Sequence, residues 1–421
     1  MSIENKVNRF LSDYPIIKKS IKRLYQLLFY SISSKEKKVG DIHRVTPNDE
    51  FEYFFGYYDK SPWDSTGRYM LTLKVDNTYK STAPTETADI LLIDTENNNT
   101  TCKLATTNTW NIQQGSMVQW LGPEYAKEII FNDFRDGNYC SVILDVNTGE
   151  ERIISKPVYS VSNDGQFGLT LDFSRLHRLR KGYGYSNKEE LTKDHKVPES
   201  TSIWKVDLQN NEITPILTYK DFYNFENNQT MIGAEHKVNH IMLNPSGNRF
   251  MVLHRWMKND VKYTRLVTAN VDGSDMYNLN DDNMTSHCFW KNDTEIIAYA
   301  NRNDSGVGYF HFVDQTSQVK PVLESLNKDG HPSYSPNGEY ILTDTYPNKE
   351  RMASIYIAHR GNIQEIAKVF APFKYDNELR CDLHPRWNRD GTKISFDSVF
   401  EGKRRQYVIN INEATLEDNN E

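Results

Sequence analysis

The sequence predicts an all-β fold, a seven-bladed β-propeller that follows an N-terminal amphipathic helix. The first observation is a repeated phrase in which a histidine stands seven residues before a turn glycine: His240 and Gly247, His331 and Gly338, His384 and Gly391. His287 has the same phase, with Thr294 in the glycine position. Successive histidines are 47 (287−240), 44 (331−287) and 53 (384−331) residues apart, a spacing typical of propeller blades.

The second observation is the make-up of each repeat. A short strand leads into a turn, then into an apolar run such as Ile341–Asp344, and then into another alternating strand such as Ser354–Ala358. Asn-Gly and Asp-Gly turns between apolar runs are strong hairpin signals, because these turns need positive φ. Each repeat therefore predicts four short antiparallel strands, the content of one propeller blade.

The blades can be placed along the chain in order. The first three begin near Tyr53, Gln113 and Tyr159, and the third carries an insertion from Ser174 to about Ser200. The last four begin near His240, His287, His331 and His384. The last repeat is one strand short, so we expect the isolated strand at 41–46 to complete it and remove an exposed edge. The propeller then spans residues 40–415, and 416–421 form an acidic tail.

Residues 1–39 differ in character from the rest of the chain. Apolar side chains recur at helical spacing, at Ile16, Ile17, Ile21, Leu24, Leu27 and Leu28. Basic side chains alternate with them, at Lys18, Lys19, Lys22 and Arg23. Such a helix can dock on the propeller or form a contact in a homo-oligomer. The alternative is a peripheral contact with an anionic membrane surface.

Composition excludes several classes of protein. The formal net charge of −7 argues against a general nucleic-acid partner. No apolar run reaches about 18 residues, so we expect no transmembrane segment. Four cysteines without a close pairing motif, and a polar first stretch without a secretory signal, predict reduced thiols and a cytoplasmic location, with peripheral contact to the inner membrane as the variant.

The histidine register predicts a site. The first strand of each blade lines the central channel of a propeller, so equivalent positions lie at one depth and the histidines should converge. We expect His331 and His384 to hold a divalent metal, together with Asp382, which lies two residues before His384 and would point the same way on a strand. Manganese, iron, nickel and zinc all suit such ligands. The alternative is that each imidazole only hydrogen-bonds a neighbouring blade.

Cations and aromatic residues accompany this ring. The blade-three insertion contains His177, Arg178, Arg180 and Tyr183, and Arg380 lies near the start of the last blade. Lys60 in blade one and Gln114 in blade two add polar groups. In an acidic protein a local basic pocket predicts an anionic ligand, and Arg suits carboxylate or phosphate groups. The alternative is a solvated loop or rim.

Two phrases resemble known families. H-P-S-Y-S-P-N-G at 331–338 resembles TolB-like propeller repeats, and D-L-H-P-R-W-N-R-D-G-T-K-I-S-F-D-S at 382–398 resembles the oligogalacturonate lyase family. The resemblance covers most of 41–415. It implies a seven-bladed propeller with a histidine-bound metal, commonly manganese, that cleaves uronic-acid oligosaccharides by β-elimination in the cytoplasm. The family's late ligands would fall on His331, His384 and Asp382, and its base on His287. The chain departs from the family at Asp382 and Leu379, where the family has His and Gln.

The resulting prediction is a metal-dependent lyase that acts on an anionic, uronic-acid-containing glycan. His287, or else His240, would be the base, and Arg178 or Arg380 would help to neutralise the substrate carboxylate. The first alternative is a propeller that binds an anionic glycan in cell-surface polysaccharide biosynthesis without this chemistry. Another glycan-modifying enzyme or an interaction scaffold also remains open.

Overall fold

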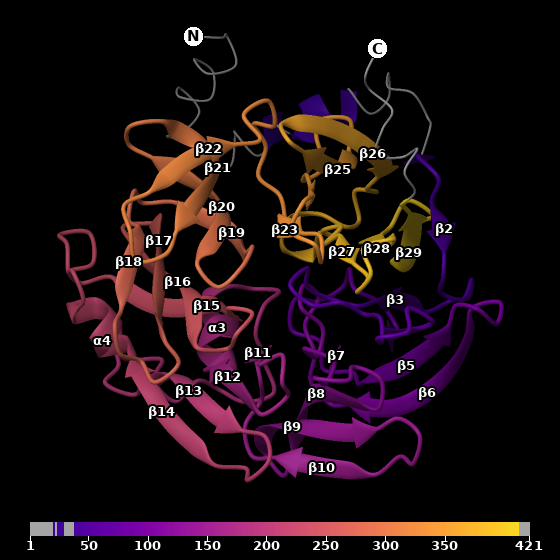
Figure 1. Cartoon of the computed structure of the whole chain (residues 1–421), viewed down its shortest axis with the longest axis horizontal. Helices are drawn as coiled ribbons and strands as arrows, with labels where there is room; N and C mark the ends of the chain where they lie inside the picture. Colours follow the sequence, from indigo (N-terminus) through magenta and orange to yellow (C-terminus); the bar gives the residue numbers. More distant parts are fainter. Residues whose placement is uncertain (1–19, 22, 29–37, 412–421) are drawn as a thin grey trace.

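The structure is a computed structural model that describes residues 20–21, 23–28 and 38–411. Seven antiparallel sheets are arranged around a central channel, so the predicted seven-bladed propeller is confirmed (Figure 1). Among the described residues, no helix combines the length and the apolar character needed to cross a bilayer.

The first three blades follow the predicted order. Blade one consists of β3 (Glu52–Phe54), β4 (Tyr69–Val75), β5 (Ala88–Asp94) and β6 (Thr100–Thr107). Blade two consists of β7 (Gln119–Trp120), β8 (Glu128–Arg135), β9 (Asn138–Asp145) and β10 (Glu151–Ile154). Blade three consists of β11 (Ser160–Val161), β12 (Phe167–Leu171), β13 (Thr201–Asp207) and β14 (Ile213–Thr218).

The next two blades contain the longest hairpin and the first two histidines of the register. Blade four consists of β15 (Glu235–Leu243), β16 (Arg249–Lys258), β17 (Val261–Asn270) and β18 (Tyr277–Asn280). Blade five consists of β19 (Thr285–Trp290), β20 (Glu295–Arg302), β21 (Gly306–Val313) and β22 (Val319–Val322).

The last two blades each take a strand from the start of the chain. Blade six consists of β23 (Ser333–Tyr334), β24 (Ile341–Asp344), β25 (Met352–His359) and β26 (Asn362–Phe370), and β1 (Lys38–Val39) pairs with β26. Blade seven consists of β27 (Arg386–Trp387), β28 (Lys393–Ser398) and β29 (Arg405–Asn410), and β2 (His43–Arg44) pairs with β29.

The second of these pairings is the one expected for 41–46. The first differs from expectation, because residues 38–39 were assigned to the helical extension, whereas their backbone extends the edge of blade six. Residues 20–21 and 23–28 of the extension are helical. The rest of that predicted helix, and the acidic tail 416–421, lie outside the described residues.

Buried tryptophans lock neighbouring blades together. The indole N–H of Trp120 in blade two donates to the carbonyl oxygen of Pro62 in blade one at 2.9 Å. The indole N–H of Trp290 in blade five likewise donates to the carbonyl oxygen of Met242 in blade four at 3.0 Å. A buried indole needs an acceptor, so each contact combines packing with a satisfied donor. These two contacts tie blade two to blade one and blade five to blade four.

The blade-three insertion begins with α3 (Phe173–Leu179). The Asp172 carboxylate caps this helix by accepting from the backbone N–H groups of Ser174 and Arg175. Arg175 is fully buried, and its Nε donates to the carbonyl oxygen of His236 on β15 at 2.8 Å. Gly184 has a φ of +65°, and a Cβ there would lie 2.3 Å from the carbonyl oxygen of Phe173, so glycine lets the chain return against α3. The insertion is therefore packed onto the channel.

Candidate metal centre

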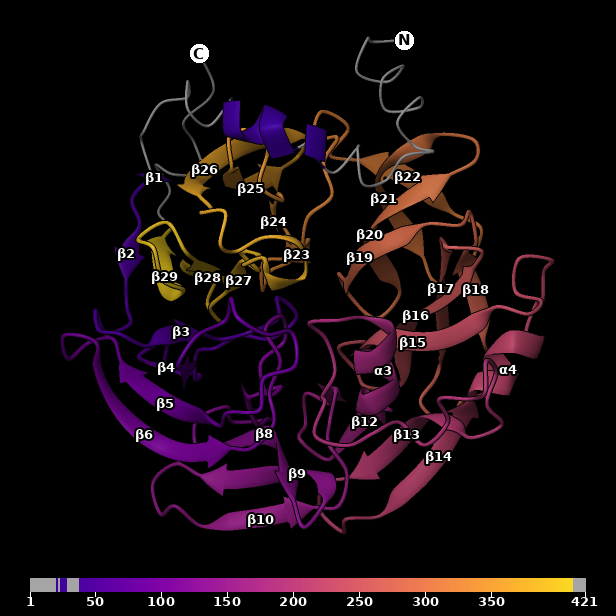
Figure 2. The ribbon, with the colours of Figure 1, turned by 180° about the vertical axis from the view of Figure 1, so that it is seen from behind.

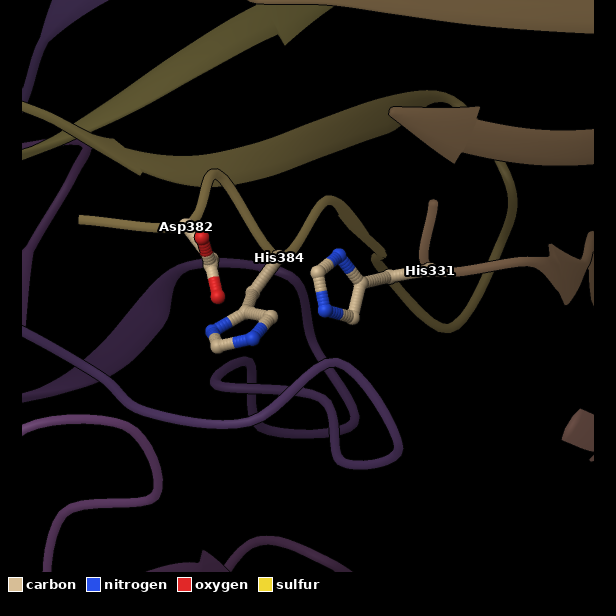
Figure 3. A group of neighbouring side chains, drawn as sticks. All are labelled: His331, Asp382 and His384. Carbon is tan, nitrogen blue, oxygen red and sulfur yellow. The ribbon is translucent and has the colours of Figure 1, made fainter. Parts of the chain in front are cut away.

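Three buried side chains converge beside the channel. One ligand atom from each of His331, Asp382 and His384 lies within 4.8 Å of the others (Figure 3). The structure corrects the expected local geometry, because Asp382 and His384 are not on a strand. They lie in the irregular segment between η2 (Asn377–Leu379) and β27, and His384 has a φ of 45°. The conformation of this loop, and not the alternation of side chains along a strand, therefore sets the direction of the Asp382 and His384 side chains.

Three of the four ring nitrogens in this group lack hydrogen-bond partners among the described residues. Nε2 of His331 and both ring nitrogens of His384 are buried and make no hydrogen bond among the described residues. A buried polar atom without a partner costs free energy, so such atoms call for a ligand. Two imidazoles and one carboxylate form a donor set that suits a divalent transition metal and leaves coordination positions open. The residues present fit a metal of this class.

Asp344, at the end of β24, holds both histidines in place. Its carboxylate accepts from Nδ1–H of His331 at 2.8 Å and from the backbone N–H of His384 at 3.2 Å. Because Nδ1 of His331 donates, Nε2 is the nitrogen with a lone pair for a metal. Burial opposes charge on His331, but the Asp344 carboxylate outweighs it and raises the pKa of His331. The sequence analysis did not identify Asp344.

Asp382 forms an ion pair with Arg380. Nε and Nη2 of Arg380 donate to the two carboxylate oxygens, the second at 3.0 Å. Burial alone would raise the pKa of Asp382, but the guanidinium lowers it, so the carboxylate is ionised. Each carboxylate oxygen has two lone pairs, which leaves one for a metal beside the ion pair. Arg380 was expected to bind substrate, and the structure places it against this ligand and over the ring of Tyr346 at 4.2 Å.

His287 on β19 lies next to the same group. Its ring centroid is 4.2 Å from that of His331. Nδ1 lies 3.1 Å from the Asp329 carboxylate, which also accepts from Oγ of Ser286 at 2.7 Å. Burial, followed by the charge on His331, lowers the pKa of His287 to about 4, so the imidazole is neutral near pH 7. With Nδ1–H held by Asp329, Nε2 is the basic nitrogen. Asp329 was not identified from the sequence.

His240 on β15 has a different environment, although it shares the register. The hydroxyl of Tyr57 lies 3.2 Å from its Nδ1, and the hydroxyl of Tyr58 lies 3.1 Å from its Nε2. The carbonyl oxygen of Cys288 is also 3.0 Å from Nε2. Both ring nitrogens therefore have partners inside the protein. His240, the second candidate for a base, contacts the two tyrosines that pack against His331 and His384.

A cavity of about 630 Å³ opens beside the centre. Asp329, Tyr346 and Arg380 line it and also contact the metal-centre residues or His287. Seven cationic side chains line it, against the two acids Asp329 and Glu378. The cations are Arg178, Arg180, Lys181, Lys237, Arg255, Lys262 and Arg380. The excess of positive charge makes this a cavity for an anion.

Blade four supplies three of these cations, Lys237, Arg255 and Lys262. Nε and Nη1 of Arg255 are buried without a hydrogen-bond acceptor among the described residues. Burial and then the neighbouring Arg180 lower the pKa of Arg255 to about 10. The charge on Arg255 and burial lower the pKa of Lys262 to about 8. Like charges thus crowd one wall of the cavity, and a bound anion would relieve their repulsion. Lys237 and Lys262 were not identified from the sequence.

The structure divides the residues predicted to bind substrate. Arg178, Arg180, Tyr183 and Arg380 line the cavity. Arg178 is also paired with Glu190 and, at 2.6 Å, with Glu235, while the Arg180 guanidinium lies over the Tyr183 ring at 4.1 Å. His177 does not line the cavity, because its ring is buried and its Nδ1 lies 3.2 Å from the carbonyl oxygen of Tyr183.

Lys60 and Gln114 do not lie at the cavity either. Lys60 pairs with Asp59 at 2.7 Å and lines a separate cavity of about 200 Å³. On β15 and β19 the first residues line the large cavity and the last residues line the small one, so the two lie at opposite ends of the channel. Gln114 is buried and donates to the hydroxyl of Tyr159 at 2.7 Å. Tyr57, Tyr58 and Tyr159 are buried in one core cluster, and Tyr57 and Tyr58 pack against His384 and His331.

Comparison with known proteins places the fold. No protein-family model matches the sequence, and no curated protein matches it. The crystal structure of an oligogalacturonate lyase from Vibrio parahaemolyticus aligns with 90% of this chain and 97% of its own, at 15% identity and a TM-score of 0.61. An oligogalacturonate lyase in complex with manganese aligns with 91% of this chain and 100% of its own, at 17% identity and a TM-score of 0.63. The chain shares the fold of these lyases.

Proposed function

We propose that this protein is a metal-dependent lyase that cleaves an anionic, uronic-acid-containing glycan by β-elimination. The observation that carries the proposal is the group of His331, His384 and Asp382, in which three buried imidazole nitrogens lack partners among the described residues, beside a cation-lined cavity. The likeness of the fold to an oligogalacturonate lyase bound to manganese supports it. Manganese is accordingly the first metal to test, followed by iron, nickel and zinc.

The reaction removes the proton next to the uronate carboxylate, forms a carbon–carbon double bond and breaks the bond to the sugar linked at the 4-position, whose oxygen takes up a proton as it leaves. That proton is a weak acid while the carboxylate keeps its charge. A metal held by His331, His384 and Asp382 would act as a Lewis acid on the carboxylate. The cations of the cavity wall, Arg180, Arg255 and Lys262, favour the negative charge that develops when the proton leaves.

His287 is the proposed base. A base must be neutral and near the proton that it takes, and burial keeps His287 neutral beside the metal centre. The Asp329 carboxylate accepts from Nδ1–H of His287, so the lone pair is on Nε2, on the side of the ring away from Asp329. When the imidazole takes the proton, the Asp329 carboxylate stabilises the positive charge that results.

The test compares His287→Ala with a matched surface variant, His195→Ala. We expect His287→Ala to lower turnover of uronate oligosaccharides about 10²–10⁴-fold while the metal stays bound, and His195→Ala to behave as the wild type. Turnover is followed by the absorbance of the unsaturated product, and metal by elemental analysis. Full turnover in His287→Ala would remove the base assignment. No turnover of any uronate polymer by the metal-loaded wild type would remove the lyase assignment.

A second candidate is a protein that binds an anionic glycan during cell-surface polysaccharide synthesis. Its support is the cation cluster of blade four, which needs an anion but no metal. Tight binding of a uronate oligosaccharide by metal-free wild type, without any turnover, would favour this candidate. The cytoplasmic location and a homo-oligomeric state stay predictions.

A further inference from the structure

The N-terminal helix, residues 20–28, sits on blade six by its polar side. Nη1 of Arg23 forms an ion pair with Asp376 at 2.7 Å, and its guanidinium lies 4.1 Å from the centre of the Phe373 ring. Figure 2 shows the helix next to β25 and β26. Arg23 and Gln26 are half-buried, so this side of the helix faces the propeller.

The apolar side of the same helix faces away from the propeller. Ile21, Leu24 and Leu27 are 44%, 67% and 45% exposed. At about 100° per residue, Ile21 and Leu24 lie about 160° and about 100° around the helix from Arg23, and Leu27 lies about 40° from it, at the border of the apolar side. An amphipathic helix on a globular domain normally buries its apolar side. In this helix the polar side faces the propeller. The apolar side chains, whose burial would stabilise the chain most, face outward.

The net charge of the N-terminal segment indicates which kind of partner covers the apolar side of the helix. Residues 1–39 contain nine Lys and Arg and three Asp and Glu, a net charge of +6 (9−3). The formal net charge of the whole chain is −7, so residues 40–421 carry a net charge of −13 (−7−6). In the sequence, Lys18, Lys19, Lys22 and Arg23 alternate with the apolar residues of this segment. An apolar stripe beside lysines matches the acyl and headgroup layers of an anionic bilayer, and the acidic remainder of the chain would be repelled by it.

The helix contacts a segment of chain that also contributes to the cavity wall. Asp376, which pairs with Arg23, also accepts from Nη1 of Arg351 at 3.0 Å. The next two residues, Asn377 and Glu378, line the large cavity. The surface that carries the helix and the wall of the cavity are therefore parts of one segment, 373–380. A bilayer in contact with the helix would be close to the cavity.

We propose that the helix 20–28 docks on the headgroup region of an anionic lipid bilayer and holds the cation-lined cavity close to its surface. The proposal does not depend on the chemistry performed in the cavity. A second copy of the chain and an acidic protein are the other occupants that this face could have, and the test below separates them from lipid.

The test is co-sedimentation of the full chain with vesicles of phosphatidylcholine alone or mixed equally with phosphatidylglycerol. We expect binding to the mixed vesicles that weakens with added salt, and little binding to the neutral ones. Leu24→Glu with Leu27→Glu should lower the bound fraction at least about tenfold, because both changes put charge on the apolar side. The matched control, Ile153→Glu with Leu191→Glu, alters two exposed apolar residues elsewhere and should bind as the wild type.

Three outcomes would overturn the proposal. The wild type could stay in the supernatant, could bind both vesicle types equally, or could bind undiminished after Leu24→Glu with Leu27→Glu. Light scattering coupled to size exclusion identifies a second copy as the occupant, if the wild type is a dimer that these changes split and no vesicle binds. Thermal unfolding of each variant checks that the propeller remains folded, which is expected because all four positions are exposed.

Discussion

Two groups of buried histidines in this propeller differ in whether their ring nitrogens have hydrogen-bond partners. In the metal centre, Nε2 of His331 and both ring nitrogens of His384 have no partner among the described residues. In blade four, His236 and His254 are equally buried, yet all four ring nitrogens have partners. The first group is arranged for something outside the protein, and the second is complete within it.

The blade-four group forms a chain of donors that runs in one direction. Nε of Arg265 must donate, so Nδ1 of His254, 3.1 Å away, accepts. Nε2–H of His254 then donates to Nδ1 of His236 at 2.9 Å, and Nε2–H of His236 donates to the carbonyl oxygen of Met231 at 3.1 Å. Both imidazoles are therefore neutral, each in one tautomer. Burial alone therefore does not identify a ligand site, whereas several converging side chains with unpaired ring nitrogens call for a ligand.

The largest expected effect is loss of the metal from the first group. His331→Ala with His384→Ala removes two of three ligands, so we expect metal content to fall from about one per chain to background. Elemental analysis of the purified proteins measures it, with His43→Ala and His195→Ala together as the control, since both histidines are exposed. Equal metal content in the two double variants would remove the metal centre.

The second largest effect is a loss of stability when the blade-four histidines are changed. His254→Ala leaves a cavity and strips Arg265 Nε and His236 Nδ1 of their partners, so we expect the free energy of unfolding to fall by about 2–4 kcal/mol. Urea unfolding measures it. Metal content should not change, which separates the two groups. A loss below about 1 kcal/mol, or loss of metal, would show that the comparison is wrong.

A smaller effect is expected at Asp344, whose carboxylate holds the histidines of the metal centre in place. Asp344→Asn keeps the shape but removes the charge that fixes the His331 tautomer, so we expect metal affinity to weaken about 10–100-fold without being abolished. Competition with a metal chelator measures the affinity. Asp272→Asn, in an exposed turn, is the control. Unchanged affinity in Asp344→Asn would mean that the carboxylate only supports the backbone.

The smallest effect is a pH dependence of stability. Burial lowers the pKa of His236 to about 4, and the nearby Arg265 and Arg175 act in the same direction. The unfolded chain therefore binds a proton that the folded chain refuses, and stability falls as the pH drops from about 6.5 towards 4, by up to about 1.4 kcal/mol per pH unit for this histidine. Urea unfolding at pH 7 and pH 5 measures the change. His236→Gln should make it shallower, and an unchanged slope would count against the assignment.

Part of the site could be predicted from the sequence. The phase of the turn glycines brought His331, His384 and His287 together, because one strand and one turn per blade repeat the same local geometry. Asp344 and Asp329 were missed, because neither has a repeated partner in the other blades. Lys60 and Gln114 lie away from the large cavity, and the sequence register does not show at which end of a strand each cavity opens.

The sequence by itself determined the number of blades, the antiparallel strands and the class of residue at the centre, since each depends on patterns within about 50 residues. Only the tertiary structure decided how the groups are used. His384 adopts positive φ in a loop, Asp344 serves two histidines 53 residues apart (384−331), and the helix turns its apolar side outward. Each of these depends on contacts between segments far apart in the chain, and a local pattern contains no record of them.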